Sequence, residues 1–290
     1  MSAIIEWSSR TMPENTTIRI LVDNQAEKGL VAEHGFSLWI ECDGRKILFD
    51  TGQSGALTTN ARILDIDLAT TDILVLSHGH YDHTGCLAPV LEQARGVHVY
   101  CHAEAIRPHY ALRGGQARPI HMSRASLAAL DRLPKSRLHL MRQPVELFSR
   151  IGITGTIPRD TYFEDAGGPF YLDPDGRRPD PVEDDMALWI RTGEGIVLCV
   201  GCAHAGLVNT VNHVQRTSND GRIRAIIGGF HLVNASPHRL EQTVAALRSL
   251  NPDMIMPCHC TGEAAFTFLR DALGDSVREG GAGTYVEYQQ

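Results

Sequence analysis

The 290-residue chain lacks several features that would each point to a particular class of protein. It has no excess of positive charge, since 27 Lys and Arg stand against 34 Asp and Glu, a formal net charge of −7. That balance argues against a general binder of nucleic acids or of acidic membranes. Residues 1–10 contain Glu6 and no apolar run as long as a signal peptide or a membrane helix needs. We therefore expect a cytoplasmic protein without a nucleic-acid or membrane partner.

The cysteines also lack the regular spacing of a disulfide framework. There are seven of them, an odd number: Cys42, Cys86, Cys101, Cys199, Cys202, Cys258 and Cys260. In a cytoplasmic chain such a set is expected to consist of reduced thiols. Apolar residues make up 43% of the chain and charged residues 21%, as in an ordinary globular protein. The length allows one large or two small domains.

What the chain does contain is a dense group of metal-binding side chains in Ser77-His78-Gly79-His80-Tyr81-Asp82-His83-Thr84-Gly85. This stretch follows the short apolar run 73–76, which predicts a buried strand. In a loop beyond a strand end, the glycines relax the backbone and the side chains can converge on one point. Neutral imidazole and carboxylate groups suit Zn²⁺, Mn²⁺ or Fe²⁺. The alternative, a set of capping and solvated residues, fits one histidine better than three histidines within six positions.

Apolar periodicity predicts alternating elements on both sides of this stretch. Strands are expected at 17–22, 36–42, 46–49, 97–101, 186–190, 195–200, 224–228 and 253–256, and helices at 58–64, 87–95, 126–130, 207–214 and 237–250. Several of the later strands end in a Gly- or Pro-bearing loop that carries a histidine, namely His204, His231 and His259. Active sites of α/β proteins lie at one end of the strands, so we expect these histidines to face the same cleft as the first group. Each of them alone could equally be structural.

The pattern weakens between about residues 105 and 185, where Pro, Gly, Arg and Asp are frequent. Because the segment lacks a periodic core of its own, we expect an insertion or lid over the site within a single domain of residues 1–290. Its arginines and His109, His121 and His139 could meet an anionic substrate. The alternative is a solvated, irregular segment.

These residues resemble the metallo-β-lactamase superfamily over about residues 17–288. The resemblance is carried by His78-x-His80-x-Asp82-His83, by the upstream Phe49-Asp50-Thr51-Gly52 and by the late His259. It implies an α/β fold, the αββα sandwich of two mixed β-sheets flanked by helices. More narrowly, the segments 201–204, 228–232 and 259–262 are similar to the branch of 7,8-dihydropterin-6-methyl-4-(β-D-ribofuranosyl)aminobenzene-5′-phosphate synthase-like proteins.

The resemblance implies two divalent metal ions, zinc first, with manganese or iron as alternatives. His78 and His80 would bind the first ion, and the second would be bound by Asp82, His83 and His259. Asp50 matches an aspartate that braces the motif loop and is not itself a ligand.

This sequence departs from the superfamily where a third histidine of the first metal and a bridging aspartate usually stand. Glu183-Asp184-Asp185 precedes Met186 in place of a histidine, and Cys202 occupies the bridging position. We expect His204 to supply the missing imidazole. Cys202 is either a thiolate ligand or a buried packing residue.

The activity implied is hydrolysis of a small, anionic ester, lactone or phosphoester by a water that two metals activate. Asp82 would orient that water, and His231 is a candidate general acid or phosphate contact. Ser77 and Tyr81 are interpreted as packing residues. One alternative is a transferase that condenses a dihydropterin pyrophosphate with an aminobenzene ribofuranosyl phosphate, and another is a binding or sensing module with a vestigial site. The expected partner is a small-molecule substrate, and the sequence leaves the oligomeric state open.

Overall fold

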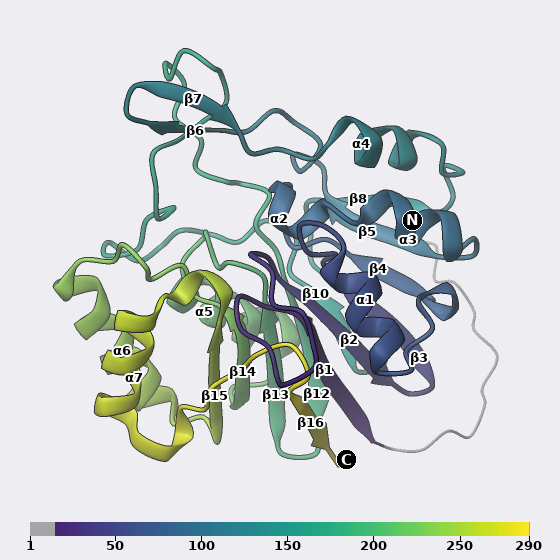
Figure 1. Cartoon of the computed structure of the whole chain (residues 1–290). Coiled ribbons are helices and arrows are strands. Elements are labelled where there is room, and N and C mark those ends of the chain that lie inside the picture. Colours follow the sequence, from purple (N-terminus) through teal and green to yellow (C-terminus); the bar gives the residue numbers. More distant parts are fainter. Residues whose placement is uncertain (1–14, 290) are drawn as a thin grey trace.

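The computed structural model describes residues 15–289, in which two large β-sheets pack face to face between two layers of helices (Figure 1). The αββα architecture predicted for the chain is thereby confirmed. Residues 1–10, on which the expectation of no signal peptide was based, lie outside the described residues. Within residues 15–289, every helix is too short or too polar to span a bilayer.

Both large sheets are mixed, with parallel and antiparallel neighbours. The seven-stranded sheet has the spatial order β16 (Tyr285–Tyr288), β1 (Thr16–Val22), β2 (Ser37–Cys42), β3 (Arg45–Phe49), β4 (Ile73–Val75), β5 (His98–His102) and β8 (Leu138–Met141). The six-stranded sheet has the order β15 (Met254–Cys258), β14 (Ile223–Gly229), β13 (Gly195–Val200), β12 (Ala187–Thr192), β10 (Ile151–Ile153) and β9 (Val145–Phe148). The runs β3-β4-β5-β8 and β13-β14-β15 are parallel. Their carboxyl ends therefore meet at one end of the sandwich.

Side-chain alternation along the strands fills separate cores on the two faces of each sheet. In β4, Ile73 and Val75 join the core between the sheets, whereas Leu74 joins the core under the helices. In β13 the same alternation sends Val197 inward and Leu198 outward. Strands buried on both faces read as continuous apolar runs.

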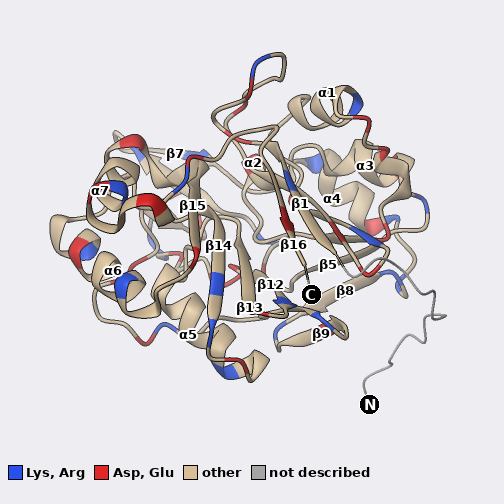
Figure 2. Ribbon diagram, turned by 90° about the horizontal axis from the view of Figure 1, so that it is seen from below, with Lys and Arg blue, Asp and Glu red and all other residues tan. Residues whose placement is uncertain are grey.

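Helices cover the outer face of each large sheet. The helices are α1 (Ala56–Ile63), α2 (Tyr81–Thr84), α3 (Leu87–Gln93), α4 (Arg124–Asp131), α5 (Leu207–Ser218), α6 (Pro237–Leu250) and α7 (Glu263–Leu273), with short 3₁₀ turns at Leu68–Thr70, His259–Thr261 and Gly274–Ser276. Helices α1, α3 and α4 bury apolar residues against the seven-stranded sheet, and α5, α6 and α7 against the six-stranded sheet. Lys, Arg, Asp and Glu lie mainly on these helices and on the connecting loops (Figure 2).

The segment 105–185, for which an insertion or lid was expected, contributes strands to all three sheets. β8 extends the seven-stranded sheet, while β9 and β10 extend the six-stranded sheet. A separate three-stranded sheet has the order β11 (Phe170–Tyr171), β6 (Tyr110–Arg113) and β7 (Gln116–Pro119). These strands are two to four residues long, too short for alternation to reveal them.

Candidate metal centre

The predicted site residues lie on loops that follow the carboxyl ends of strands in both large sheets. His78 and His80 follow β4, His204 follows β13, His231 follows β14, and His259 follows β15. The neighbours β13, β14 and β15 are parallel, so their loops are adjacent. The expected gathering of these histidines is what the fold produces.

Several residues around the site have left-handed backbone conformations although none of them is glycine. The φ angles are 60° for Asp50, 52° for Ala203, 45° for His231 and 48° for His259. Such conformations are unfavourable for residues with a Cβ and are concentrated at functional sites. At each position the turn sets the direction in which the side chain leaves the backbone.

One group of ligand atoms is formed by Asp82, His83 and His259. The Nε2 atoms of His83 and His259 lie 3.3 Å apart, and Nε2 of His259 lies 3.3 Å from Oδ2 of Asp82. Ligand atoms on a tetrahedral zinc ion, with bonds of about 2.0–2.1 Å, are separated by about 3.3 Å. Both separations from His259 therefore match those of ligands on one ion.

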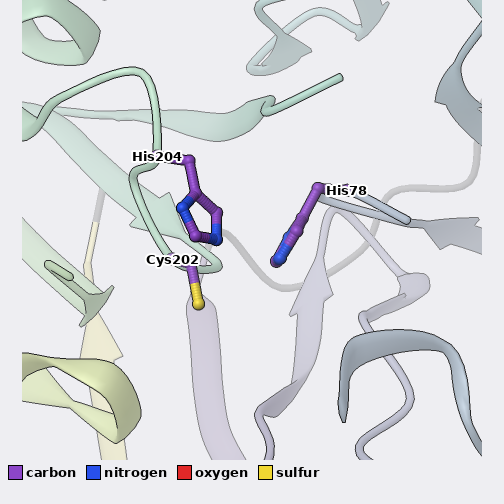
Figure 3. Close-up of side chains that lie close together, drawn as sticks. All are labelled: His78, Cys202 and His204. Carbon is purple, nitrogen blue, oxygen red and sulfur yellow. The ribbon is translucent and has the colours of Figure 1, made fainter. Parts of the chain in front are cut away.

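A second group is formed by His78, His80 and His204. Nε2 of His78 lies 3.0 Å from Nδ1 of His80, and the ring of His204 is centred 4.9 Å from each of those two rings. Nε2 of His204 is buried and has no hydrogen-bond partner. Figure 3 shows the imidazoles of His204 and His78 facing each other across a small gap, with the Cys202 sulfur beside them. A buried nitrogen without a partner is unfavourable unless something else satisfies it, and a metal ion in this gap would do so.

The sulfur of Cys202 lies between these two groups. Sγ is 3.2 Å from Nε2 of His83. It is also within 4.8 Å of ligand atoms of His78 and His204 on one side, and of His83 and His259 on the other. That is the position in which a single atom could bridge two ions.

A sequence profile described as the metallo-beta-lactamase superfamily matches residues 31–259. The chain belongs to this superfamily. The protein MJ0448 of Methanocaldococcus jannaschii is 37% identical over 255 residues, covering 87% of this chain and 93% of that protein. The 7,8-dihydropterin-6-methyl-4-(beta-D-ribofuranosyl)-aminobenzene-5′-phosphate synthase of the same organism is 28% identical over 267 residues, covering 89% and 90%. Among solved structures, Tm1679, described as a metal-dependent hydrolase of the beta-lactamase superfamily, aligns with a TM-score of 0.81 and 29% identity over 95% of this chain and all of that one.

The superfamily aspartate predicted to brace the motif loop does so here. Oδ1 of Asp50 accepts a hydrogen bond of 2.7 Å from the amide of Ser77, and Oδ2 accepts bonds of 2.6 Å from the Ser77 hydroxyl and 2.7 Å from Nδ1 of His83. The Ser77 oxygen in turn lies 2.9 Å from Nδ1 of His78. Ser77 is therefore more than the packing residue that was expected, because it links Asp50 to His78.

These contacts fix which ring nitrogen of each imidazole is free for a metal. Nδ1 of His83 donates to Asp50, Nδ1 of His204 to the Ala166 carbonyl at 2.8 Å, and Nδ1 of His259 to Oδ1 of Asn24 at 2.9 Å. In each case the other nitrogen, Nε2, keeps its lone pair. Donation from the distal nitrogen is the usual support for a metal-binding histidine.

The protonation equilibria of His78, His80, His204 and Asp82 favour metal-binding forms. His83 differs: burial acts to lower its pKa, but the charge of Asp50 and the hydrogen bond with it raise the pKa above its usual value. Burial lowers the pKa of His78, His80 and His204 well below the usual value, and neighbouring imidazoles lower it further. Burial acts to raise the pKa of Asp82, but the neighbouring imidazoles of His259, His34 and His83 hold it well below its usual range. Neutral imidazole and ionised carboxylate are the forms that bind metals. Burial raises the pKa of the Cys202 thiol, so its thiolate would depend on the metal, which deprotonates a coordinating thiol.

The acidic residues that stand in place of the expected histidine connect two site loops. Oδ2 of Asp184 accepts a hydrogen bond of 2.6 Å from the amide of Gly79, and Oδ2 of Asp185 accepts one of 2.7 Å from the amide of Ala205. Burial raises the pKa of Asp185 to about 7. These adjacent carboxyl groups hold the motif loop and the loop of His204 at a constant separation.

Sequence reasoning missed some residues that the fold brings to the site. His34, in the loop before β2, places Nε2 3.2 Å from Oδ2 of Asp82. Cys260 accepts a hydrogen bond of 3.3 Å from the amide of His231 and groups with His231 and Cys202 within 4.8 Å. Nothing in the local sequence marks His34. Cys260 stands next to the predicted ligand His259, and that adjacency was the one available signal.

Proposed function

We propose that this protein is a metal-dependent hydrolase that holds two divalent metal ions, zinc first, with manganese or iron as alternatives. The first ion would be bound by His78, His80 and His204, and the second by Asp82, His83 and His259. Cys202 would contribute its thiolate to both. Membership of the superfamily and the 29% identity to a metal-dependent hydrolase support the proposal.

One observation carries this proposal, the spacing of Asp82, His83 and His259. Nε2 of His259 lies 3.3 Å from Nε2 of His83 and 3.3 Å from Oδ2 of Asp82, the separation of two ligands on a tetrahedral ion, although these residues are up to 177 positions apart in the chain. A set of structural histidines would satisfy both ring nitrogens, whereas here Nε2 of His80 and His204 are buried without hydrogen-bond partners.

When bound, such ions lower the pKa of a coordinated water and polarise the bond to be broken. The chain's own residues would then orient the reactants. Asp82, held ionised by His34 and His259, would accept a hydrogen bond from the water and fix its direction. His231 is part-buried, its ring centre is 4.2 Å from that of His204, and its Nδ1 has no partner. It would donate a proton to the leaving group or bind an anionic oxygen of the substrate.

The test combines metal analysis with an activity screen. Protein purified without added metal is expected to contain close to two equivalents and to hydrolyse at least one class among esters, lactones and phosphodiesters. His80→Ala should lose metal and activity with its circular dichroism spectrum unchanged, whereas the exposed control His238→Ala should keep both. Full activity in His80→Ala would refute the ligand assignment.

A second candidate function is a transferase that joins a dihydropterin pyrophosphate to an aminobenzene ribofuranosyl phosphate. The 28% identity to the synthase, over 89% of the chain, supports it. Pyrophosphate would be released only when the pterin and the aromatic co-substrate are both present. Turnover of a single ester or phosphodiester without a co-substrate favours the hydrolase.

A further inference from the structure

The small sheet β11-β6-β7 covers the metal centre with an aromatic side chain. The ring of Phe170, on β11, is centred 5.4 Å from that of His80, 5.3 Å from that of His204 and 6.0 Å from that of His231. Phe170 therefore forms a wall over histidines from separate loops.

Strand pairing places two arginines on the same face of the small sheet as Phe170. Phe170 pairs with Ala111, and Ala111 pairs with Arg118. Residues directly opposite each other in antiparallel strands present their side chains on the same face, so Arg118 lies on the face of Phe170. Arg113 lies on this face as well, because it is two positions beyond Ala111 in β6. The side chain of the intervening Leu112 lies on the other face, where it packs against Gly176. A Cβ added to Gly176 would lie 2.1 Å from Cδ1 of Leu112.

The small sheet is attached to the motif stretch itself. The amide of Tyr81 donates a hydrogen bond of 2.8 Å to the Ile120 carbonyl, and His80 forms a β-bridge with His121. In Figure 1, β6 and β7 lie at the same end of the molecule as α2.

The charge of this region is of one sign, although the chain as a whole is acidic. Residues 105–130 contain four arginines and neither Asp nor Glu, against a net charge of −7 for the chain. Arg107 pairs with Glu104. Arg113 and Arg118 are exposed and form no ion pair with a carboxylate of residues 15–289. Two guanidinium groups without counter-charges are suited to a carboxylate or phosphate.

We propose that the face of the small sheet bearing Phe170, Arg113 and Arg118 is the substrate-recognition surface of the metal centre. It would take a substrate with a planar or apolar body against Phe170 and an anionic group, phosphate or carboxylate, at the arginines. Neighbouring strands are spaced by about 4.8 Å, so the anionic group lies on the order of 10 Å from the part that contacts Phe170. The inference rests on the proposed function only in taking the metal centre as the place of reaction.

Binding of small aromatic anions to the metal-loaded protein tests this surface without requiring turnover. The probes are biphenyl-4-phosphonate, biphenyl-4-carboxylate and the neutral biphenyl-4-carboxamide, measured by titration calorimetry. The anions should bind about tenfold more tightly than the amide, since charge-assisted hydrogen bonds contribute most of the difference. A preference for phosphonate over carboxylate, or the reverse, identifies which anion the surface suits. Added salt should reduce the preference for anions.

Matched variants separate the arginines from the metals as the anion site. Arg113→Gln/Arg118→Gln should abolish the preference for anions, whereas Arg62→Gln, on the exposed side of α1, should retain it. Phe170→Leu should lower the affinity for all three probes by the same factor. Phe268→Leu, at an exposed position on α7, should leave all three affinities unchanged. If the anion preference survives in the double arginine variant, the anions bind at the metals and the inference is wrong. Absence of hydrolysis for every substrate would overturn the proposed function but not these affinities.

Discussion

The sulfur of Cys202 lies 3.2 Å from Nε2 of His83, a nitrogen that also approaches Nε2 of His259 at 3.3 Å. Cys202→Ser should lower zinc affinity by more than about tenfold, because a hydroxyl is a much weaker ligand than a thiolate. In cobalt-substituted protein, the variant should also lose the thiolate-to-metal charge-transfer absorption. Chelator competition and absorption spectroscopy measure the two effects.

Cys199→Ser is the control for a buried sulfur that is remote from the metals. Cys199 lies in the core between the sheets, so its substitution should lower the free energy of unfolding and leave the cobalt spectrum intact. If Cys202→Ser behaves in the same way, Cys202 is a packing residue. Cys202→Asp, which restores a carboxylate, should retain both ions and shift the preference from zinc toward manganese.

Asp50→Asn tests the bracing of the motif loop. Oδ2 of Asp50 now accepts hydrogen bonds from the Ser77 hydroxyl and from Nδ1 of His83. The side-chain amide of asparagine would place an N–H group opposite these two donors. Metal affinity should fall about 10- to 100-fold. The free energy of unfolding should fall by about 1–3 kcal/mol for each hydrogen bond that is lost. Asp67→Asn serves as the control, since Asp67 only caps a 3₁₀ turn through the Ala69 amide, and asparagine caps equally well. Equal metal affinity in Asp50→Asn and the wild type would contradict the bracing role.

Much of the fold could be predicted because its longer strands have one side chain in each core. The strand expected at 195–200 is β13 at the same residues, and the helix expected at 237–250 is α6. The positions of the candidate ligands could also be predicted, since the loops that carry their histidines follow strands whose apolar runs are evident in the sequence. The superfamily assignment, confirmed by the profile over residues 31–259, could be made from the motif stretch together with residues 49–52 and His259.

What could not be predicted depends on contacts between distant residues. The bond from Gly79 to Asp184 spans 105 positions, so the replacement of an expected histidine by acidic residues gave no hint of their bracing role. His34 approaches Asp82 only because the loop before β2 folds over α2. The strands of the segment 105–185 are too short to show alternation, and helix α7 was not anticipated although its amphipathic pattern is present in the sequence.

Gly79→Ala tests the close approach of the motif loop to the segment after β5. A Cβ at position 79 would lie 2.1 Å from the carbonyl oxygen of Ala105, so the backbone between His78 and His80 has to shift. The free energy of unfolding should fall by about 1–3 kcal/mol, as in other overpacked sites, and metal content should fall with it. Gly96→Ala is the control, because nothing lies within 4 Å of its added Cβ. It should be neutral or slightly stabilising. Full metal content in Gly79→Ala would show that the loop adjusts without moving its ligands.

His102 makes stability depend on pH through a group outside the metal centre. Its Nδ1 accepts a hydrogen bond of 3.1 Å from the Glu104 amide and its Nε2 lies 2.8 Å from the Thr156 hydroxyl, so the neutral ring is fully satisfied. Burial, with Arg142 nearby, lowers the pKa of His102 to about 4 from 6.5. The unfolded chain therefore binds the proton more readily between these values, and the contribution of His102 to stability is lost as the pH falls from about 6.5 to about 4.

His102→Gln should remove this contribution, so that the difference in free energy of unfolding between wild type and variant narrows with decreasing pH. The limiting slope is about 1.4 kcal/mol per pH unit for one proton. Denaturant unfolding at a series of pH values measures this difference in free energy of unfolding. The metal ligands titrate in both proteins, so their contribution cancels in the difference. The exposed control His238→Gln should follow the wild type throughout. Parallel curves for His102→Gln and the wild type would mean that His102 is protonated equally well in the folded and unfolded chain.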